Sequence, residues 1–338
     1  MKSAAAFNSL FSLFMKILER ASNSNVTSIG SRLVQPLRLA LLLALCTPLS
    51  TRAAETGKTF ATPEDAVAAL VQATSAHSGS ELRAIFGSAA ADIQNPDRVQ
   101  ATNEFAAFSA ALDAAHRLVR ESDSKYVLEV GTNGWPFPVP IVKQAGWWFF
   151  DTAAGKDEIL SRRIGKNELS TLEAVRAYVE AQREYASRDR NGDEVLEYAP
   201  RIASTPGTKD GLYWPPELDG EISPLGPLVA DAQEEGYQVE TKGKGTPRTP
   251  FHGYYFKILT AQGKNAPGGK YSYIINGHMI GGFALVAWPS EYGESGIMTF
   301  IVNQQGRAYQ KDLGPKTGKL AETMKVYDPD PSWSVSAD

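Results

Sequence analysis

The feature that most constrains the fold of this chain is a change in its hydrophobic periodicity. Between residues 62 and 115, apolar side chains recur at helical spacing, with predicted helix starts at Thr62, Ser80 and Asn103. From Tyr126 the apolar residues follow strand-like runs, at 126–130 and 147–150. Helices followed by an antiparallel meander favour an α+β layer fold.

The second half of the chain repeats this order of elements. A long amphipathic helix is predicted over 169–187, followed by a loop-rich stretch and a short helix over 228–235. Strands are then expected in the following segments: 254–259, 271–275, 283–288, 297–302 and 307–310. We therefore expect two α+β domains, at 54–168 and 169–338.

The N-terminal 53 residues have the pattern of a secretory signal. A basic flank precedes the apolar run Leu39–Leu45, and small residues follow Pro48. The run is too short for a permanent membrane span, so membrane contact is expected only before cleavage, which we place after Ala53. Export to the periplasm or the extracellular space is therefore expected.

Three alternatives concern this leader. Met15 can serve as the true start, because the basic flank is long. Lipid anchoring at Cys46 is disfavoured, because Leu45 is larger than the residue that usually precedes a lipidated cysteine. The same apolar run could also be a buried core helix.

Charge and cysteine content exclude several classes of protein. Residues 1–53 hold six of the 34 Lys+Arg and one of the 38 Asp+Glu, so the remainder carries 28 and 37, a net charge of −9. Because phosphate binding needs clustered basic residues, no nucleic-acid partner is expected. One cysteine and four histidines exclude a disulfide framework and a multi-cysteine zinc site.

The best candidate for a metal site follows the long helix. Asp189, Asn191, Asp193 and Glu197 place oxygen ligands at spacings that suit Ca²⁺, and Val195 can add a backbone carbonyl. The match to an EF-hand loop is partial, because the glycine comes early and a proline stands where a bidentate glutamate belongs. A solvated turn is the alternative, since Asp, Asn and Gly are turn formers.

Other chemical candidates have weaker patterns. The histidines are scattered, so a zinc hydrolase is not expected, and Ser295 lacks the second glycine of a nucleophile elbow. Arg162, Arg163 and Lys166 can meet an anion or form a solvated helix end. The clustered aromatic residues suit either a binding groove or, as we favour, core packing: Trp135, Phe137, Trp147, Trp148, Tyr213, Trp214, Tyr254, Tyr255 and Trp288.

Several strings together closely resemble a bacterial exported family known as domain of unknown function 2950. The resemblance covers almost the whole chain after the leader and implies export, but it brings no activity with it. The strings are Asn133–Pro138, Phe150–Gly155, Arg162–Leu169, Glu197–Ala199, Asp210–Trp214, Ser223–Pro227, His252–Phe256, Gly281–Pro289 and Tyr292–Gly296.

Each half also resembles a known fold. The element order over residues 60–165 is similar to the nuclear transport factor 2-like, or cystatin-like, cone of helices on a curved antiparallel sheet. The second half resembles a pseudopilin globular head, on the strings Gly253–Ile258, Gly282–Ala287 and Gly296–Phe300. A pilin begins with an apolar filament-forming helix, whereas the helix at 169–187 is amphipathic, so filament assembly is not implied.

The function expected from these patterns is a non-enzymatic exported protein that binds or scaffolds an envelope protein or a small ligand. The alternative is an enzyme or small-ligand receptor that uses a pocket in the cone-like domain. An enzyme needs titratable groups that converge in a cleft. A scaffold needs an exposed apolar surface instead.

Overall fold

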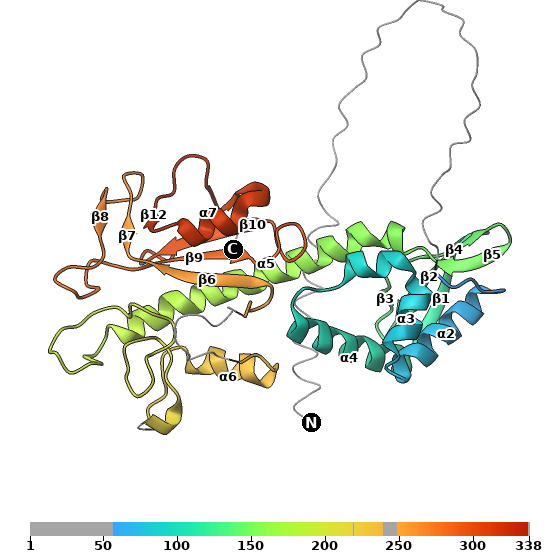
Figure 1. The fold of residues 1–338 in the computed structure, drawn as a ribbon, viewed down its shortest axis with the longest axis horizontal. Coiled ribbons are helices and arrows are strands. Elements are labelled where there is room, and N and C mark those ends of the chain that lie inside the picture. The colour runs from blue at the N-terminus through green and yellow to red at the C-terminus, as the bar shows by residue number, and fades with distance from the viewer. Residues whose placement is uncertain (1–56, 219, 239–248, 337–338) are drawn as a thin grey trace, which may run out of the picture. The chain divides into compact units, whose positions relative to one another are not determined.

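The computed structural model describes residues 57–218, 220–238 and 249–336 (Figure 1). The predicted signal segment, its cleavage position and Cys46 lie outside the described residues. The described residues form one compact unit. Among the described helices, none combines the length and the apolar character that a membrane span requires.

The N-terminal half begins with helices whose N-termini are capped by the side chain of the preceding residue. In α2, Thr62 Oγ1 accepts from the Asp65 backbone N–H at 3.1 Å, and the Asp65 carboxylate accepts from the Thr62 N–H at 3.2 Å. The N-cap of α3 is Ser78 and not the predicted Ser80. The helices are α2 (Pro63–Ser75), α3 (Gly79–Phe86), η1 (Ser88–Ile93) and α4 (Arg98–Ala114).

An antiparallel sheet packs against these helices. Its order is β1-β2-β4-β5, and β3 pairs with β2. The first strand was not predicted, because its sequence is polar and it is largely exposed. The strands are β1 (His116–Ser122), β2 (Lys125–Val130), β3 (Trp135–Pro136), β4 (Ile141–Gln144) and β5 (Trp147–Phe150).

Helix α5 (Thr152–Tyr185) is much longer than the predicted 169–187. It starts directly after β5, where the Asp151 side chain accepts from the Ala154 N–H at 3.0 Å. Its first half contacts the N-terminal core through Ile159, and its second half belongs to the C-terminal core. The predicted domain boundary near residue 168 therefore falls inside one continuous helix.

The C-terminal half is built on a second antiparallel sheet of order β13-β11-β10-β9-β6. A smaller sheet of order β12-β7-β8 stands beside it, and β12 and β7 pair in parallel. The strands are β6 (Tyr254–Leu259), β7 (Ala261–Gln262), β8 (Tyr271–Ser272), β9 (Ala284–Pro289), β10 (Met298–Asn303), β11 (Tyr309–Asp312), β12 (Val326–Tyr327) and β13 (Ser334–Val335).

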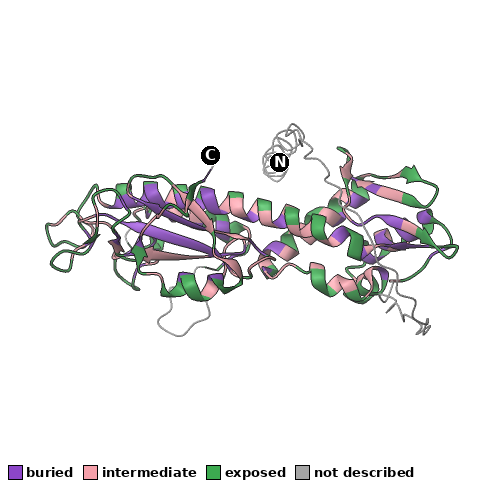
Figure 2. Ribbon diagram, turned by 90° about the horizontal axis from the view of Figure 1, so that it is seen from above, coloured by how far each residue is buried: buried purple, intermediate pink, exposed green. Residues whose placement is uncertain are grey.

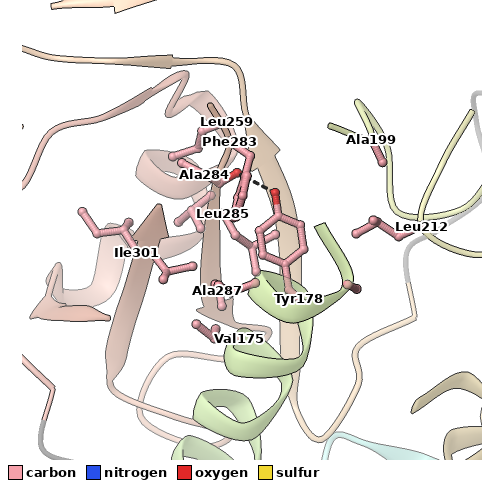
Figure 3. Close-up of a cluster of buried hydrophobic side chains, with 14 of the residues drawn as sticks. Val175, Tyr178, Ala199, Leu212, Leu259, Phe283, Ala284, Leu285, Ala287 and Ile301 are labelled. Atoms are coloured by element: carbon pink, nitrogen blue, oxygen red, sulfur yellow. Dashed lines mark hydrogen bonds between the residues drawn. The ribbon is translucent and has the colours of Figure 1, made fainter. Parts of the chain in front are cut away.

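Strand β9 is the centre of this half. All six of its residues are buried, because α5 and α7 both contact it (Figures 1 and 2). Tyr178 of α5 lies in the same core, and its hydroxyl donates to the Ala284 carbonyl at 3.2 Å (Figure 3). The remaining elements are η2 (Pro216–Leu218), α6 (Gly226–Glu234), η3 (Gly314–Lys316) and α7 (Thr317–Thr323).

The architecture bears on two of the predictions made from the sequence. The α+β class is confirmed, with helices and open antiparallel sheets in both halves. The predicted strand at 271–275 is shorter, since it ends at Ser272 and a tight hairpin follows. The cone-like and pilin-head-like arrangements stay predictions.

A chain of buried hydrogen bonds joins the two halves. The Gln100 side chain donates to Asn167 Oδ1 at 2.8 Å, and Asn167 Nδ2 donates to the Ser295 carbonyl at 2.8 Å. Nearby, Tyr237 Oη and the Gly253 N–H donate to one oxygen of Asp97 at 2.8 and 3.1 Å. These groups satisfy one another, which offsets the cost of their burial.

Candidate functional site

The loop after α5 is shaped by Asp189. One oxygen of its carboxylate accepts from the N–H groups of Asn191 and Gly192, at 3.1 and 2.7 Å, and the other accepts from Glu194 at 2.8 Å. These backbone hydrogen bonds lower the pKa of Asp189, since they favour the charged carboxylate. Asp189 therefore serves the turn rather than a shared centre.

The side chains that do converge come from two segments of the chain. Asp193 and Glu197 of the loop meet His278, and one ligand atom from each lies within 4.8 Å of the other two. His278 Nδ1 is 3.4 Å from Asp193 Oδ2 and 3.3 Å from Glu197 Oε2. The Met279 N–H also donates to Glu197 Oε2 at 3.1 Å, so the glutamate is fixed against the second segment.

Asn191 faces the same two carboxylates. Its Nδ2 lies 2.8 Å from Asp193 Oδ2 and 2.8 Å from Glu197 Oε1. Of the four predicted calcium ligands, the structure thus brings together Asn191, Asp193 and Glu197, and Asp189 bonds to the backbone. His278 joins them, although its position in the sequence gave no sign of this.

His278 is carried by a tight hairpin between β8 and β9. Ile275 and His278 exchange two backbone hydrogen bonds, of 2.8 and 3.0 Å, around a two-residue turn. Asn276 and Gly277 have φ of 52° and 92°, which Asn and Gly adopt more readily than other residues. We call residues 273–281 the isoleucine hairpin.

The isoleucine hairpin exposes a group of large apolar side chains. The exposed fractions of Ile274, Ile275 and Ile280 are 39%, 46% and 43%. Tyr273 and Met279 of the same hairpin are buried and attach it to the C-terminal core. From the sequence a strand was expected over 271–275, and the apolar pattern gave no indication of this exposure.

The other sequence candidates have structural roles. Ser295 is fully buried in a turn, and its hydroxyl donates to the Glu291 carbonyl at 3.1 Å. Arg163 is not part of a solvated helix end, because it is buried in mid-helix and donates to the Gln94 carbonyl at 3.0 Å. Lys166 pairs with Glu104 at 2.8 Å.

Most of the clustered aromatic residues pack in the two cores, as favoured from the sequence. Trp148, Tyr213, Trp214, Tyr254 and Trp288 are buried members of these cores. Trp147 differs, with 53% of its surface exposed next to the turn between β4 and β5.

The cavity described in the N-terminal half is small. It has a volume of about 80 Å³, which suits a few water molecules. Lys58 and Glu81 are its charged lining residues, beside Gln72 and Ile85.

Comparison with known proteins settles the family. A family model described as "Protein of unknown function (DUF2950)" matches residues 57–335, nearly all of the described chain. This chain belongs to that family. No curated protein and no solved structure matches it. The resemblances of its halves to the nuclear transport factor 2-like fold and to pseudopilin heads therefore stay predictions for this family member.

Proposed function

We propose that this chain is an exported bacterial envelope protein that binds or scaffolds a protein partner and catalyses no reaction. The observation that carries the proposal is the isoleucine hairpin. Single exposed apolar residues are ordinary on a protein surface, whereas a contiguous exposed apolar patch is typical of an interaction site. We take the three exposed isoleucines together as such a patch.

The hairpin is also well suited to binding because it is already ordered. Its Asn-Gly turn, its backbone pairing and the buried anchors Tyr273 and Met279 fix the backbone before any partner arrives. A preordered element loses less conformational entropy on binding, so more of the contact energy remains as affinity.

Export is the second part of the proposal. It rests on the basic flank, the apolar run Leu39–Leu45 and the small residues near Ala53. The net charge of −9 after removal of residues 1–53 is consistent with a protein partner and disfavours nucleic acid.

An enzyme or a small-ligand receptor is the alternative. It would need a cleft with converging titratable groups, in the N-terminal half. The small cavity beside Lys58 and Glu81 offers little room for a substrate. We base the binding role on the exposed hairpin and not on this cavity.

The test compares two variants of the full chain in its own bacterial host. One carries Ile274→Ser, Ile275→Ser and Ile280→Ser, and the control carries Ile222→Ser and Leu320→Ser, which are exposed by 69% and 46% elsewhere. Chemical crosslinking of the envelope fraction is expected to yield a discrete complex that the hairpin variant loses at least tenfold and the control keeps. Cytoplasmic location, or a complex that survives in the hairpin variant, would contradict the proposal.

A further inference from the structure

We propose that Asp193, Glu197 and His278 form a binding site for a divalent transition cation of the zinc class. The donors are two carboxylates and one imidazole, and they come from two separate segments. Their ligand atoms lie within 4.8 Å of one another, so a small movement of the side chains would bring all three to one ion. This inference goes beyond the binding role and does not depend on the partner of the hairpin.

The charges around the site favour a cation. In the described part of the chain, His278 Nδ1 is the basic group within 4 Å of Asp193 and Glu197, and neither carboxylate pairs with a lysine or arginine. Two neighbouring carboxylates repel each other, and the side chain of Glu197 is largely shielded from water, with 12% of its surface exposed. A divalent ion would neutralise both charges.

Asn191, in the same loop as the two carboxylates, lies beside both of them. Its Nδ2 stands 2.8 Å from an oxygen of each carboxylate, which places the positive end of the amide dipole between them. Rotation of this amide by half a turn would present Oδ1 to a bound ion. The side chain can thus serve as a fourth ligand without a change in the backbone.

The donor set selects the class of ion. Calcium prefers six to eight oxygen ligands, and the expected first oxygen ligand, Asp189, is held by three backbone N–H groups. An imidazole with two carboxylates instead suits zinc and related ions, whose structural sites are usually four-coordinate, and Asn191 can supply the fourth ligand.

A bound ion would tie the loop after α5 to the isoleucine hairpin. Glu197 already accepts a hydrogen bond from Met279 of this hairpin at 3.1 Å. Metal coordination by the neighbouring His278 would add a second link between the same segments. Because the ion would bind the folded chain and not the unfolded one, it should raise the unfolding midpoint.

The experiment uses the purified full chain with any affinity tag removed and metal stripped by EDTA and dialysis. Equilibrium dialysis with elemental analysis is run with Zn²⁺ and, separately, with Ca²⁺, and thermal unfolding is recorded in parallel. The site variants are His278→Gln and Asp193→Asn. Their controls are His77→Gln and Glu194→Gln, exposed residues outside the converging set.

The expected result is one Zn²⁺ per chain, a higher unfolding midpoint with Zn²⁺, and affinity at least tenfold weaker in both site variants but not in the controls. The variants must also keep the midpoint of the metal-free chain, which separates lost binding from misfolding. Preferential Ca²⁺ binding that survives His278→Gln would overturn the inference in favour of an oxygen-only site. Zinc binding that is absent, or equal in the site and control variants, would overturn it outright.

Discussion

The buried charges of this protein are retained because each has several partners. Asp97 is almost fully buried, yet its carboxylate accepts from Val99 and Gln100 at the start of α4 and from Tyr237 and Gly253 of the C-terminal half. The cost of desolvating a carboxylate is offset when this many donors point at it. One aspartate therefore caps a helix and joins two parts of the chain.

His252, next to Gly253, is also buried, but it has few partners that would stabilise its charged form. Its Nε2 lies 3.3 Å from a Glu235 oxygen, and its Nδ1 is buried without a hydrogen-bond partner in the described structure. Burial lowers the pKa of His252 from 6.5 to about 4, with the positive charge of Lys166 as a further cause. Burial also raises the pKa of Glu235.

These shifts predict an acid-sensitive stability. Since the folded-state pKa of His252 is depressed, the unfolded chain binds more protons between pH 6.5 and about 4, and the unfolding free energy falls as the pH is lowered through that window. The raised pKa of Glu235 opposes this trend at pH 4.5 and above. Comparison with a His252 variant isolates the histidine contribution.

Urea unfolding of the wild type and of His252→Gln at pH 7 and pH 4.5 measures that contribution. The wild type is expected to lose roughly 2 kcal/mol more than the variant on acidification. Parallel losses in the two proteins would show that His252 does not titrate in this range.

At the scale of elements, α5 contains two glycines in contrasting surroundings. A Cβ added at Gly155 would lie 2.9 Å from the Pro138 carbonyl oxygen and 2.9 Å from Val139, where the helix passes close to the chain before β4. A Cβ added at Gly165 would meet no atom within 4 Å. Gly155 allows the helix to approach Pro138 and Val139 closely, whereas no neighbouring atom requires a glycine at position 165.

These surroundings predict that replacing glycine with alanine has opposite effects on stability at positions 155 and 165. Gly155→Ala should destabilise the protein by about 1–3 kcal/mol through overpacking. Gly165→Ala should stabilise it by about 0.5–1 kcal/mol, because alanine has the higher helix propensity. Denaturant unfolding of both variants tests this, and a shift in the same direction for both would contradict the account of α5.

The same helix shows what sequence patterns can and cannot predict. Its second half was predicted because Leu172, Val175 and Val179 form an apolar stripe. Its first half was missed, since it holds two glycines and buries the polar residues Arg163 and Asn167, whose partners come from distant segments. Helical periodicity does not report on hydrogen bonds to distant residues.

The candidate metal site also contains one part that follows from local sequence and one part that does not. Asn191, Asp193 and Glu197 lie together in the structure because neighbours in a tight turn stay close, and the metal site itself stays a prediction. The convergence of His278 depends on the turn at Asn276–Gly277 and on the hydrogen bonds of Met279 to Glu197 and Tyr198, which hold the hairpin beside the loop. A contact of this kind requires the tertiary structure.

At the scale of the whole molecule, Asn167 connects the two halves. It is fully buried, it accepts from Gln100 of α4, and it donates to the Ser295 carbonyl before β10. Removal of its side chain would leave a buried donor and a buried acceptor without partners, each of which costs about 1–3 kcal/mol.

Calorimetry of Asn167→Ala tests this connection. The wild type is expected to unfold in one transition, and the variant to lose about 2–6 kcal/mol, the sum for the two unpartnered groups, or to separate into two transitions. Glu180→Ala, on an exposed position of the same helix, is the control and should change stability by less than about 0.5 kcal/mol. An unchanged Asn167→Ala profile would mean that the two halves are joined by other contacts.

We propose that the isoleucine hairpin contacts a partner in the cell envelope. The most direct measurement replaces Ile275 with a photocrosslinking amino acid in the full chain, expressed in its own host, with the same replacement at Ile222 as the control. Illumination should give a discrete protein adduct in the envelope fraction from position 275 and none from position 222. No adduct from position 275, or the same adducts from both positions, would contradict the claim.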